Sequence, residues 1–168
     1  MNIHKNKGMF LESIINSSNQ FYYENNIAII HKKNLDIDFK SIDLKNKKLV
    51  VNNAFIKSKS TVDYYGIYKG IFLAFEAKST NEKNFSLSNV KRHQIEYLSL
   101  IASHQGLAFW IIYFNLQNKF IVIKHDKFMK ISKNKKTLAY SLLLANGISI
   151  ELDFPGILDY LKVFNFDD

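Results

Sequence analysis

The sequence predicts a single mixed α/β domain in which helices pack on a β-sheet, and three observations support this fold class. Apolar residues recur at helical spacing near the N-terminus and in short, strand-like runs through the middle of the chain. The 168 residues, 47% of them hydrophobic, are enough for one buried core. Because no Pro-rich or Gly/Ser-rich linker and no internal repeat divides the sequence, we expect residues 1–168 to form one domain.

The first elements are a helix, a strand and a protruding hairpin. A helix is expected at Gly8–Tyr23, where apolar residues lie three and four positions apart, and a short strand at Ile27–Ile30. In Asn34–Lys59, apolar and charged residues alternate over residues 35–40, and a second apolar run at residues 49–51 follows the basic run at residues 45–48, which predicts a two-stranded protrusion. Two interpretations of its basic tip have equal weight, a solvated turn and a contact with DNA.

The central strands are expected on either side of one short turn. Ser60–Tyr64 and Ile71–Phe75 are predicted to be strands, joined by a turn at Tyr65–Gly70. The continuous apolar run at Ile71–Phe75 is typical of a strand that is buried on both faces. It continues into Glu76-Ala77-Lys78, after which residues 79–84 are predicted to form a polar loop.

The second half of the chain is expected to add one long helix, two core strands and shorter elements. The helix should begin at Ser88 or Asn89, either of which suits a helix N-cap, and end near Ser103. The basic stretch Lys124–Lys136 predicts no regular element. The other predicted elements are core strands at Leu107–Phe114 and Phe120–Ile123, a short helix at Leu138–Ala145, an edge strand at Ile148–Leu152 and a terminal helix at Ile157–Phe164.

The charge of the chain favours a polyanionic partner. Lys and Arg number 23 against 15 Asp and Glu, which gives a net charge of +8, and Arg92 is the only Arg. Lys contacts phosphate as a point charge, whereas base recognition favours the forked Arg guanidinium. We therefore expect contacts with the backbone and shape of a nucleic acid. An acidic protein, an anionic membrane or a compositional bias towards Lys would also fit the charge.

Composition excludes several classes of protein. The absence of Cys excludes a disulfide scaffold and a thiolate zinc site. The apolar runs are far shorter than the roughly 20 residues that span a bilayer. The polar segment Met1–Lys7 lacks the apolar core of a signal peptide. We therefore expect a cytoplasmic protein without membrane contact.

Charged residues at the end of the Ile71–Phe75 run are the first candidates for catalysis. Because side chains alternate along a strand, Glu76 and Lys78 should point to the same face. The alternative is a weak ion pair on a strand that has emerged into solvent. Pairing across the short turn would place Asp63 beside Glu76, unless Asp63 is an unrelated turn residue. Two adjacent carboxylates repel each other unless a cation joins them, and Mg²⁺ favours such oxygen ligands.

Gln94 is a further candidate on the predicted helix. It lies four residues after Val90 and four before Leu98, both on the apolar face, so its side chain should point inward. The amide needs partners there, which are either backbone groups or a metal-bound water or phosphate.

Asp63, Glu76, Lys78 and Gln94 together indicate phosphodiester hydrolysis. Asp63 and Glu76 would hold Mg²⁺, or Mn²⁺ in its place, against the scissile phosphate. Lys78 would stabilise the negative charge that builds on the phosphate or position the attacking water. The pattern Asp-x(n)-Glu-x-Lys on adjacent strands is typical of restriction-endonuclease-like nucleases, although the bare pattern also occurs by chance.

Five blocks of the sequence, in order and spanning roughly residues 6–98, resemble the RecU family of Holliday junction resolvases. The blocks are Asn6-Lys7-Gly8-Met9-Phe10-Leu11-Glu12, the segment Tyr22–Lys33, the segment Ser60–Gly70, Phe75-Glu76-Ala77-Lys78 and the segment Leu87–Ile95.

The resemblance implies a restriction-endonuclease-like fold, a mixed β-sheet flanked by helices. It implies a homodimer that nicks four-way DNA junctions symmetrically with Mg²⁺ during homologous recombination and DNA repair, with recombination proteins as further partners. For individual residues it implies a transition-state role for Lys78, a supporting position behind the metal ligands for Glu12, and metal binding by Thr61, Asp63, Glu76 and Gln94.

The resemblance also assigns residues 34–59 to a stalk that rises from the dimer and enters the junction. The stalk of the family typically contains Pro and Arg, whereas this segment contains Lys and no Arg. Contacts with phosphate survive that change, but forked Arg contacts do not. The residues predicted to contact DNA are Lys45, Lys47 and Lys48 on the protrusion and Lys69, Lys91 and Arg92 near the site.

Two other functions fit the same fold. One is a nuclease that cuts duplex DNA, and the other is a non-catalytic protein that bridges or anneals DNA strands, against which the intact acidic residues and Lys78 argue. The aromatic residues Tyr64, Tyr65 and Tyr68 lie beside the predicted site, where each would either stack on a base or pack in the core. We expect packing for at least one of them.

Overall fold

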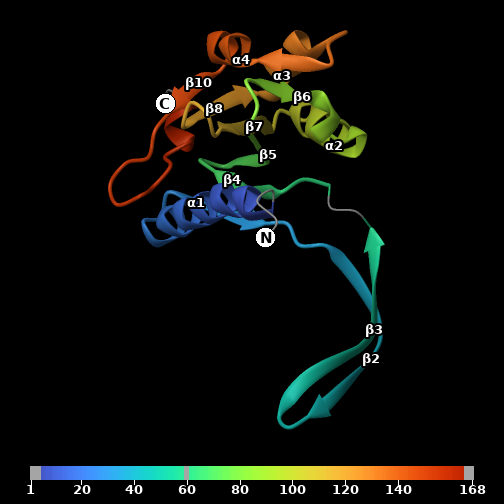
Figure 1. The fold of residues 1–168 in the computed structure, drawn as a ribbon. Helices are drawn as coiled ribbons and strands as arrows, with labels where there is room; N and C mark the ends of the chain where they lie inside the picture. Colours follow the sequence, from blue (N-terminus) through green and yellow to red (C-terminus); the bar gives the residue numbers. More distant parts are fainter. Residues whose placement is uncertain (1–4, 59–60, 165–168) are drawn as a thin grey trace.

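The structure, a computed structural model, describes residues 5–58 and 61–164 and is built around a six-stranded mixed sheet (Figure 1). The strand order is β1-β4-β5-β7-β8-β10; β5 and β7 are parallel and the other neighbours are antiparallel. These strands are β1 (Ala28–Lys32), β4 (Tyr64–Tyr68), β5 (Ile71–Thr80), β7 (Leu107–Phe114), β8 (Lys119–Lys124) and β10 (Ile148–Ile150). The predicted mixed α/β class is confirmed.

Helices cover both faces of the sheet (Figure 1). Helix α1 (Lys5–Glu24) packs on one face, over a core in which the rings of Phe75 and Phe109 stack at 4.6 Å. On the other face, a second core around Trp110 and Phe128 lies under α2 (Arg92–Ser103), α3 (His125–Ser132) and α4 (Tyr140–Asn146). None of the helices in the described part of the chain is long and apolar enough to cross a membrane.

The predicted hairpin is confirmed as a separate two-stranded sheet that projects away from the body (Figure 1). It consists of β2 (Asp36–Lys45) and β3 (Lys48–Ser58). Asn46 and Lys47 form the two-residue turn with φ angles of 49° and 61°. Positive φ at both positions matches the twist of the flanking strands, which is why short hairpins favour such turns. Lys59, the predicted end of the hairpin, lies outside the described residues.

The strand predicted at Ser60–Tyr64 and the turn predicted at Tyr65–Gly70 are wrong in their bounds. Strand β4 begins at Tyr64 and contains Gly66, so only Lys69 and Gly70 form the turn. Gly66 marks a close approach of two strands, because a Cβ atom there would lie 2.1 Å from the Ile29 carbonyl oxygen. The sequence signal of a turn glycine was therefore misleading. Ser60 lies outside the described residues.

Two boundaries around the polar loop also differ from the prediction. Residues 79 and 80 still belong to β5, and Asn84 begins β6 (Asn84–Ser86), which pairs with β9 (Thr137–Ala139). The helix predicted from Ser88 or Asn89 begins at Arg92, because residues 87–89 form the separate 3₁₀ turn η1 (Leu87–Asn89). Ser86 caps that turn, so the polar residues before the helix serve η1 instead.

The C-terminal third contains the largest errors of prediction. The stretch Lys124–Lys136, for which no element was predicted, contains α3. The helix predicted at Ile157–Phe164 is wrong, since only the 3₁₀ turn η2 (Leu161–Val163) forms there. Two backbone N–H groups of residues 157–164 bond to side chains of helix α1: Leu158 N–H donates to Ser18 Oγ at 2.9 Å and Leu161 N–H donates to the Tyr22 hydroxyl at 3.2 Å. The edge strand predicted at Ile148–Leu152 is confirmed as the shorter β10.

Candidate active site

Glu76 lies in the interior of β5 and its side chain has no exposed surface. Its neighbours Leu73, Ala74 and Phe75 are also fully buried, so a continuous apolar run carries this carboxylate into the core. The alternative of a surface ion pair is thereby excluded. A buried charge is costly unless it is paired, and the surroundings of Glu76 supply its partners.

Lys78 and Asp63 lie next to Glu76, as strand alternation and the short turn predicted. Lys78 Nζ is 2.6 Å from Glu76 Oε2 and 3.5 Å from Asp63 Oδ2. Strand pairing of Tyr64 with Phe75 brings Asp63 opposite Glu76, and Asp63 Oδ2 accepts the Ala77 N–H at 3.1 Å. Asp63 is therefore held in place and is not an unrelated turn residue.

Gln94 connects helix α2 to this cluster. Its side chain is buried, and its Nε2 donates a hydrogen bond to Glu76 Oε2 at 2.6 Å. Its Oε1 accepts the backbone N–H of Lys91 at 3.0 Å, at the start of α2. The inward direction predicted for Gln94 is confirmed. The amide nitrogen faces the carboxylate and the amide oxygen caps the helix, so Gln94 orients Glu76 in this arrangement.

In this cluster, burial and the pairing of opposite charges shift the pKa values in opposite directions. Burial raises the pKa of Glu76 to about 8; the ammonium of Lys78 opposes that rise and the carboxylate of Asp63 adds to it. Burial lowers the pKa of Lys78, but the carboxylates of Asp63 and Glu76 outweigh burial and leave that pKa raised. At neutral pH the cluster therefore tends to keep a proton on Glu76, which a bound cation would displace.

The donor set fits a hard divalent cation. Glu76 Oε1 is buried and has no hydrogen-bond partner in the structure, so it is available as a ligand. Among the described side chains, no group of three or more His, Cys, Asp or Glu comes together to hold a metal. Mg²⁺ usually binds one or two carboxylates and completes its shell with water and substrate phosphate, so the pair Asp63 and Glu76 suits this ion.

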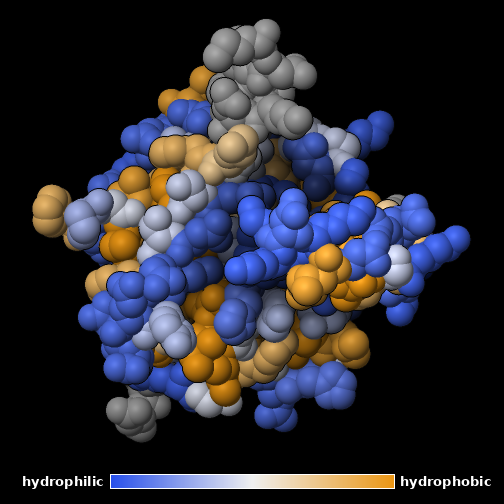
Figure 2. Space-filling view, turned by 90° about the horizontal axis from the view of Figure 1, so that it is seen from below, coloured by the Kyte–Doolittle hydropathy of each residue, from blue (hydrophilic) through white to orange (hydrophobic). Residues whose placement is uncertain are grey.

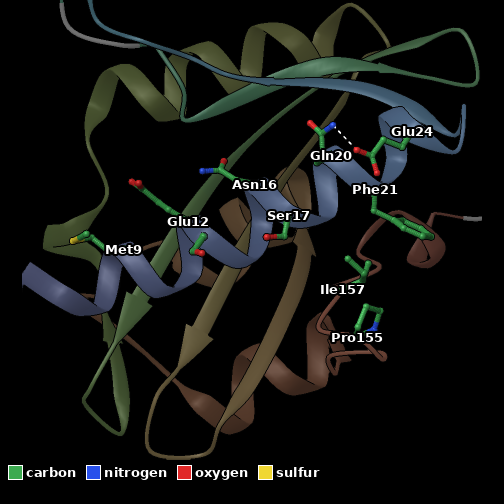
Figure 3. A pocket seen from close by; sticks show the side chains of 10 residues that line it. Met9, Glu12, Asn16, Ser17, Gln20, Phe21, Glu24, Pro155 and Ile157 are labelled. Atoms are coloured by element: carbon green, nitrogen blue, oxygen red, sulfur yellow. Dashed lines mark hydrogen bonds between the residues drawn. The ribbon is translucent and has the colours of Figure 1, made fainter.

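Two other predicted site residues do not take part in the contacts of the cluster described above. Thr61 and Asp63 both precede β4, so strand alternation does not decide whether Thr61 shares the face of Asp63. Glu12, on α1, forms an exposed ion pair with Lys32 at 2.7 Å. It lines a groove of about 710 Å³ along α1, drawn in Figure 3, that contains none of the four clustered side chains.

The predicted DNA-contacting residues fall into three places. Lys45 and Lys48 form the last cross-strand pair of the hairpin, with Lys47 in the turn between them. Lys91 and Arg92 are exposed at the start of α2, three and two residues before Gln94. Lys69 lies in the turn at the opposite end of β4 from Asp63, roughly 20 Å away at about 3.3 Å per residue. The expectation that Lys69 lies near the site is wrong, because β4 extends through the predicted turn.

The hairpin also exposes apolar side chains that sequence reasoning did not single out. Leu44 is paired with Leu49 and Ile42 with Val51, and all four face the same side of the hairpin. Leu44 and Leu49 are 72% and 74% exposed. Figure 2, which looks at the face from which the hairpin projects, shows hydrophobic residues between hydrophilic ones. The alternation of apolar and charged residues in the sequence was the signal that could have revealed these exposed side chains. We call the side chains of Leu44, Leu49, Ile42 and Val51 the hairpin patch.

Lys33 was also missed as a contributor to the site. Its backbone N–H donates to the carbonyl oxygen of Asp63 at 2.8 Å, immediately after β1, and so fixes the chain just before β4. A backbone contact of this kind leaves no mark in side-chain chemistry, although Lys33 is the last residue of the second block that resembles the RecU family.

Comparisons with known proteins show which family the chain resembles. The chain matches the family described as "RecU: Recombination protein U" over residues 6–166. It is 44% identical over 159 residues to "Holliday junction resolvase RecU" of Mycoplasmopsis pulmonis, a match that covers 95% of this chain and 94% of that protein. It is 34% identical over 163 residues to the protein of the same name in Staphylococcus aureus, covering 93% and 78%.

A solved structure shares the architecture. Archaeoglobus fulgidus Hjc, described as a Holliday junction resolvase from an archaeal hyperthermophile, superposes with a TM-score of 0.50 at 9% identity, over 81% of this chain and 93% of that chain. At that identity the likeness concerns the fold alone, and it confirms the predicted restriction-endonuclease-like arrangement.

Proposed function

The chain belongs to the RecU family, and we propose that it is a Holliday junction resolvase, an endonuclease that cuts four-way DNA junctions by paired symmetrical nicks. The observation that carries this proposal is the buried cluster of Asp63, Glu76 and Lys78, in which Glu76 Oε1 has no hydrogen-bond partner. A purely DNA-bridging protein would have no need to keep Glu76 fully buried beside a second carboxylate and an ammonium at the expense of stability.

The chemistry assigned to these residues is metal-dependent phosphodiester hydrolysis. Asp63 and Glu76 would hold Mg²⁺, or Mn²⁺ in its place, with Thr61 and Gln94 as the further proposed ligands. A bound Mg²⁺ supplies Lewis acidity and lowers the pKa of a water molecule. Lys78, held between both carboxylates, stabilises the charge that develops on the phosphate. Glu12 has only a supporting role.

A homodimer would supply the two active sites that paired nicking requires. The hairpin patch supports this part of the proposal, because a two-stranded sheet with four exposed apolar side chains is only marginally stable without a partner. A second hairpin from another copy would cover the patch and leave the lysines at the tip directed towards DNA.

Recognition is proposed to depend on the shape and backbone of the junction. The lysines at the hairpin tip, together with Lys91 and Arg92 near the active site, provide charge for phosphates but only one forked guanidinium. The proposed place of action is the cytoplasm, in recombination and repair of DNA, with recombination proteins as partners.

The test is a panel of labelled four-way junction, flap and duplex substrates, incubated with the protein and Mg²⁺. We expect symmetrical nicks in the junction and at least tenfold slower cutting of the others, with no nicks from Asp63→Asn. Equal cutting of all substrates would support a duplex-cutting nuclease instead. Junction binding by the wild type without any Mg²⁺- or Mn²⁺-dependent nicking would support a bridging or annealing protein.

A further inference from the structure

The sheet face that carries the acidic cluster continues over three strands as an uncovered aromatic and apolar surface. On β4, Tyr65 pairs with Ala74, which lies two residues before Glu76 on β5, so Tyr65 and Ile67 share the sheet face of Glu76. Cross-strand pairing adds His31 opposite Tyr65 and Phe72 opposite Ile67. Directly opposed residues of antiparallel strands share a face, so these side chains extend the row that begins at the catalytic carboxylates.

Three rings form a connected series on this face. The ring centroids of His31 and Tyr65 are 6.1 Å apart, and those of Tyr65 and Phe72 are 6.4 Å apart with planes 27° from parallel. His31 and Phe72 are exposed, and Tyr65 is half-buried between them. The rings are therefore fixed by one another and by the sheet while still reaching the surface.

The neighbouring tyrosines do not share this position. Tyr64 is fully buried on the α1 side, where its ring stacks on Phe75 at 4.9 Å and its hydroxyl donates to Asn16. Tyr68 packs against the same core. Tyr65 packs with part of its ring against the core on the other face, around Trp110, and of the three tyrosines that the sequence places beside the site it alone is on that face.

The acidic cluster opens towards Tyr65. Exposure of the side chains rises from 0% at Glu76 to 18% at Lys78 and 34% at Asp63, so the cluster is most accessible at Asp63, immediately before β4, and we call this side its entrance. Two residues along a strand span about 7 Å, which places Tyr65 at the rim of that entrance. A phosphate that reaches Asp63 from solvent would bring its attached nucleotide over the ring of Tyr65.

We propose that the surface formed by His31, Tyr65 and Phe72 binds a base flanking the scissile phosphate by stacking, and so positions the DNA strand for cleavage. This inference rests on the proposed nuclease function and deepens it. DNA, not a second copy of the chain, is the proposed occupant because the surface is continuous with the catalytic row and meets its entrance. Because an aromatic ring can stack on any base, this contact would position the DNA strand without selecting a particular sequence.

The experiment uses Tyr65→Ala, Tyr65→Phe and Tyr65→Leu, with Phe154→Ala as the control because Phe154 is an exposed aromatic residue that follows β10, the strand at the opposite edge of the sheet from β1. Stacking on one base accounts for roughly a 5- to 150-fold effect upon truncation to alanine. We expect Tyr65→Ala to lower kcat/KM for junction nicking by at least fivefold. Tyr65→Phe should retain the kcat/KM of the wild type, whereas Tyr65→Leu should not. Phe154→Ala should behave as the wild type.

A second readout reports the stacked base directly. A junction with 2-aminopurine next to the scissile phosphate is bound to protein carrying Asp63→Asn, which prevents cleavage. We expect a fluorescence change on binding that Tyr65→Ala removes and Tyr65→Phe retains. Equal rescue by Tyr65→Leu, no change of fluorescence, or a weaker dimer for Tyr65→Ala in sedimentation would each overturn the proposal. Absence of nicking by the wild type would instead refute the nuclease function, so the two failures are distinguishable.

Discussion

The interior of β5 and the β2–β3 hairpin each reverse the usual distribution of side chains. In β5, charged Glu76 and Lys78 lie in a core of fully buried apolar residues, whereas in the hairpin, apolar Leu44 and Leu49 are almost three-quarters exposed. Buried charge and exposed apolar surface both cost free energy in the isolated chain. The comparison indicates that each region is built for a partner, a cation and phosphate for β5 and a second hairpin with DNA for β2–β3.

The largest effect should follow from changing the carboxylates of the β5 region. Because a bound metal contributes several kcal/mol of charge stabilisation, Asp63→Asn or Glu76→Gln should slow junction nicking by roughly 10³-fold or more. Junction binding, measured by gel shift without divalent ions, should change by less than about threefold. Glu96→Gln, an exposed acidic residue on α2, is the control. Equal losses of binding and cleavage would mean that the cluster has a structural role only.

The hairpin patch allows the corresponding test of the exposed apolar region. Leu44→Ser combined with Leu49→Ser should weaken the proposed dimer by roughly 100-fold, because burial of one Leu contributes about 1.5–3 kcal/mol. Sedimentation equilibrium measures this dissociation constant. Ser41→Ala, on the other side of the hairpin, should leave it unchanged. A monomeric wild type, or a dimer that tolerates both substitutions, would remove the hairpin patch from the interface.

The pH dependence of the free energy of unfolding tests whether the ionised carboxylate of Glu76 is unfavourable in the folded β5 region. The pKa of Glu76 is raised from 4.5 in the unfolded chain to about 8, so the native state binds the proton more tightly. Its contribution to stability is complete below pH 4.5 and is lost as pH rises through 8. Without metal, the free energy of unfolding should fall by about 2 kcal/mol between pH 6.5 and 8.5.

Chemical denaturation at the two pH values measures this difference, and Glu76→Gln should abolish it. The comparison begins at pH 6.5 because burial lowers the pKa of His125, which destabilises the native state at lower pH. Mg²⁺ should restore stability at pH 8.5 by binding the ionised carboxylate. If the free energy of unfolding of the wild type did not change with pH, the protein would stabilise the ionised carboxylate of Glu76 without a metal.

Charge at the hairpin tip should have a smaller effect. Replacing Lys45, Lys47 and Lys48 with Gln should reduce the slope of log K against log salt by roughly 2 to 3 per hairpin that contacts DNA. Titration of a labelled junction at several salt concentrations gives this slope. The matched control replaces Lys133, Lys135 and Lys136, three lysines beyond α3, with Gln. An unchanged slope for the tip variant would exclude the tip from the DNA interface.

The smallest effect is expected from Glu12. Its ion pair with Lys32 is nearly half exposed, and such pairs contribute about 0–1 kcal/mol to stability. Glu12→Gln should therefore leave the unfolding midpoint almost unchanged and reduce nicking by no more than a few-fold. A loss of tenfold or more in kcat would place Glu12 in the metal site.

Local patterns in the sequence determined the central part of this protein. Strand alternation placed Glu76 and Lys78 on one face, the short connection placed Asp63 opposite them, and helical spacing turned Gln94 inward. Each of these inferences depends on residues close in the chain, where the periods of 2 and 3.6 fix side-chain direction. The pattern of apolar and charged residues at 34–59 predicted the hairpin for the same reason.

Tertiary structure decided what depended on contacts between distant segments. Gly66 has the signal of a turn but lies inside β4, because strand β1 approaches too closely for any Cβ atom. Residues 157–164 have a helical pattern but bond to α1. Only the packed structure separates the buried Tyr64 from Tyr65 at the entrance of the site, or shows that Lys69 lies at the far end of its strand. Sequence periodicity gives the direction of a side chain, but what that side chain meets depends on which elements are stacked beside it.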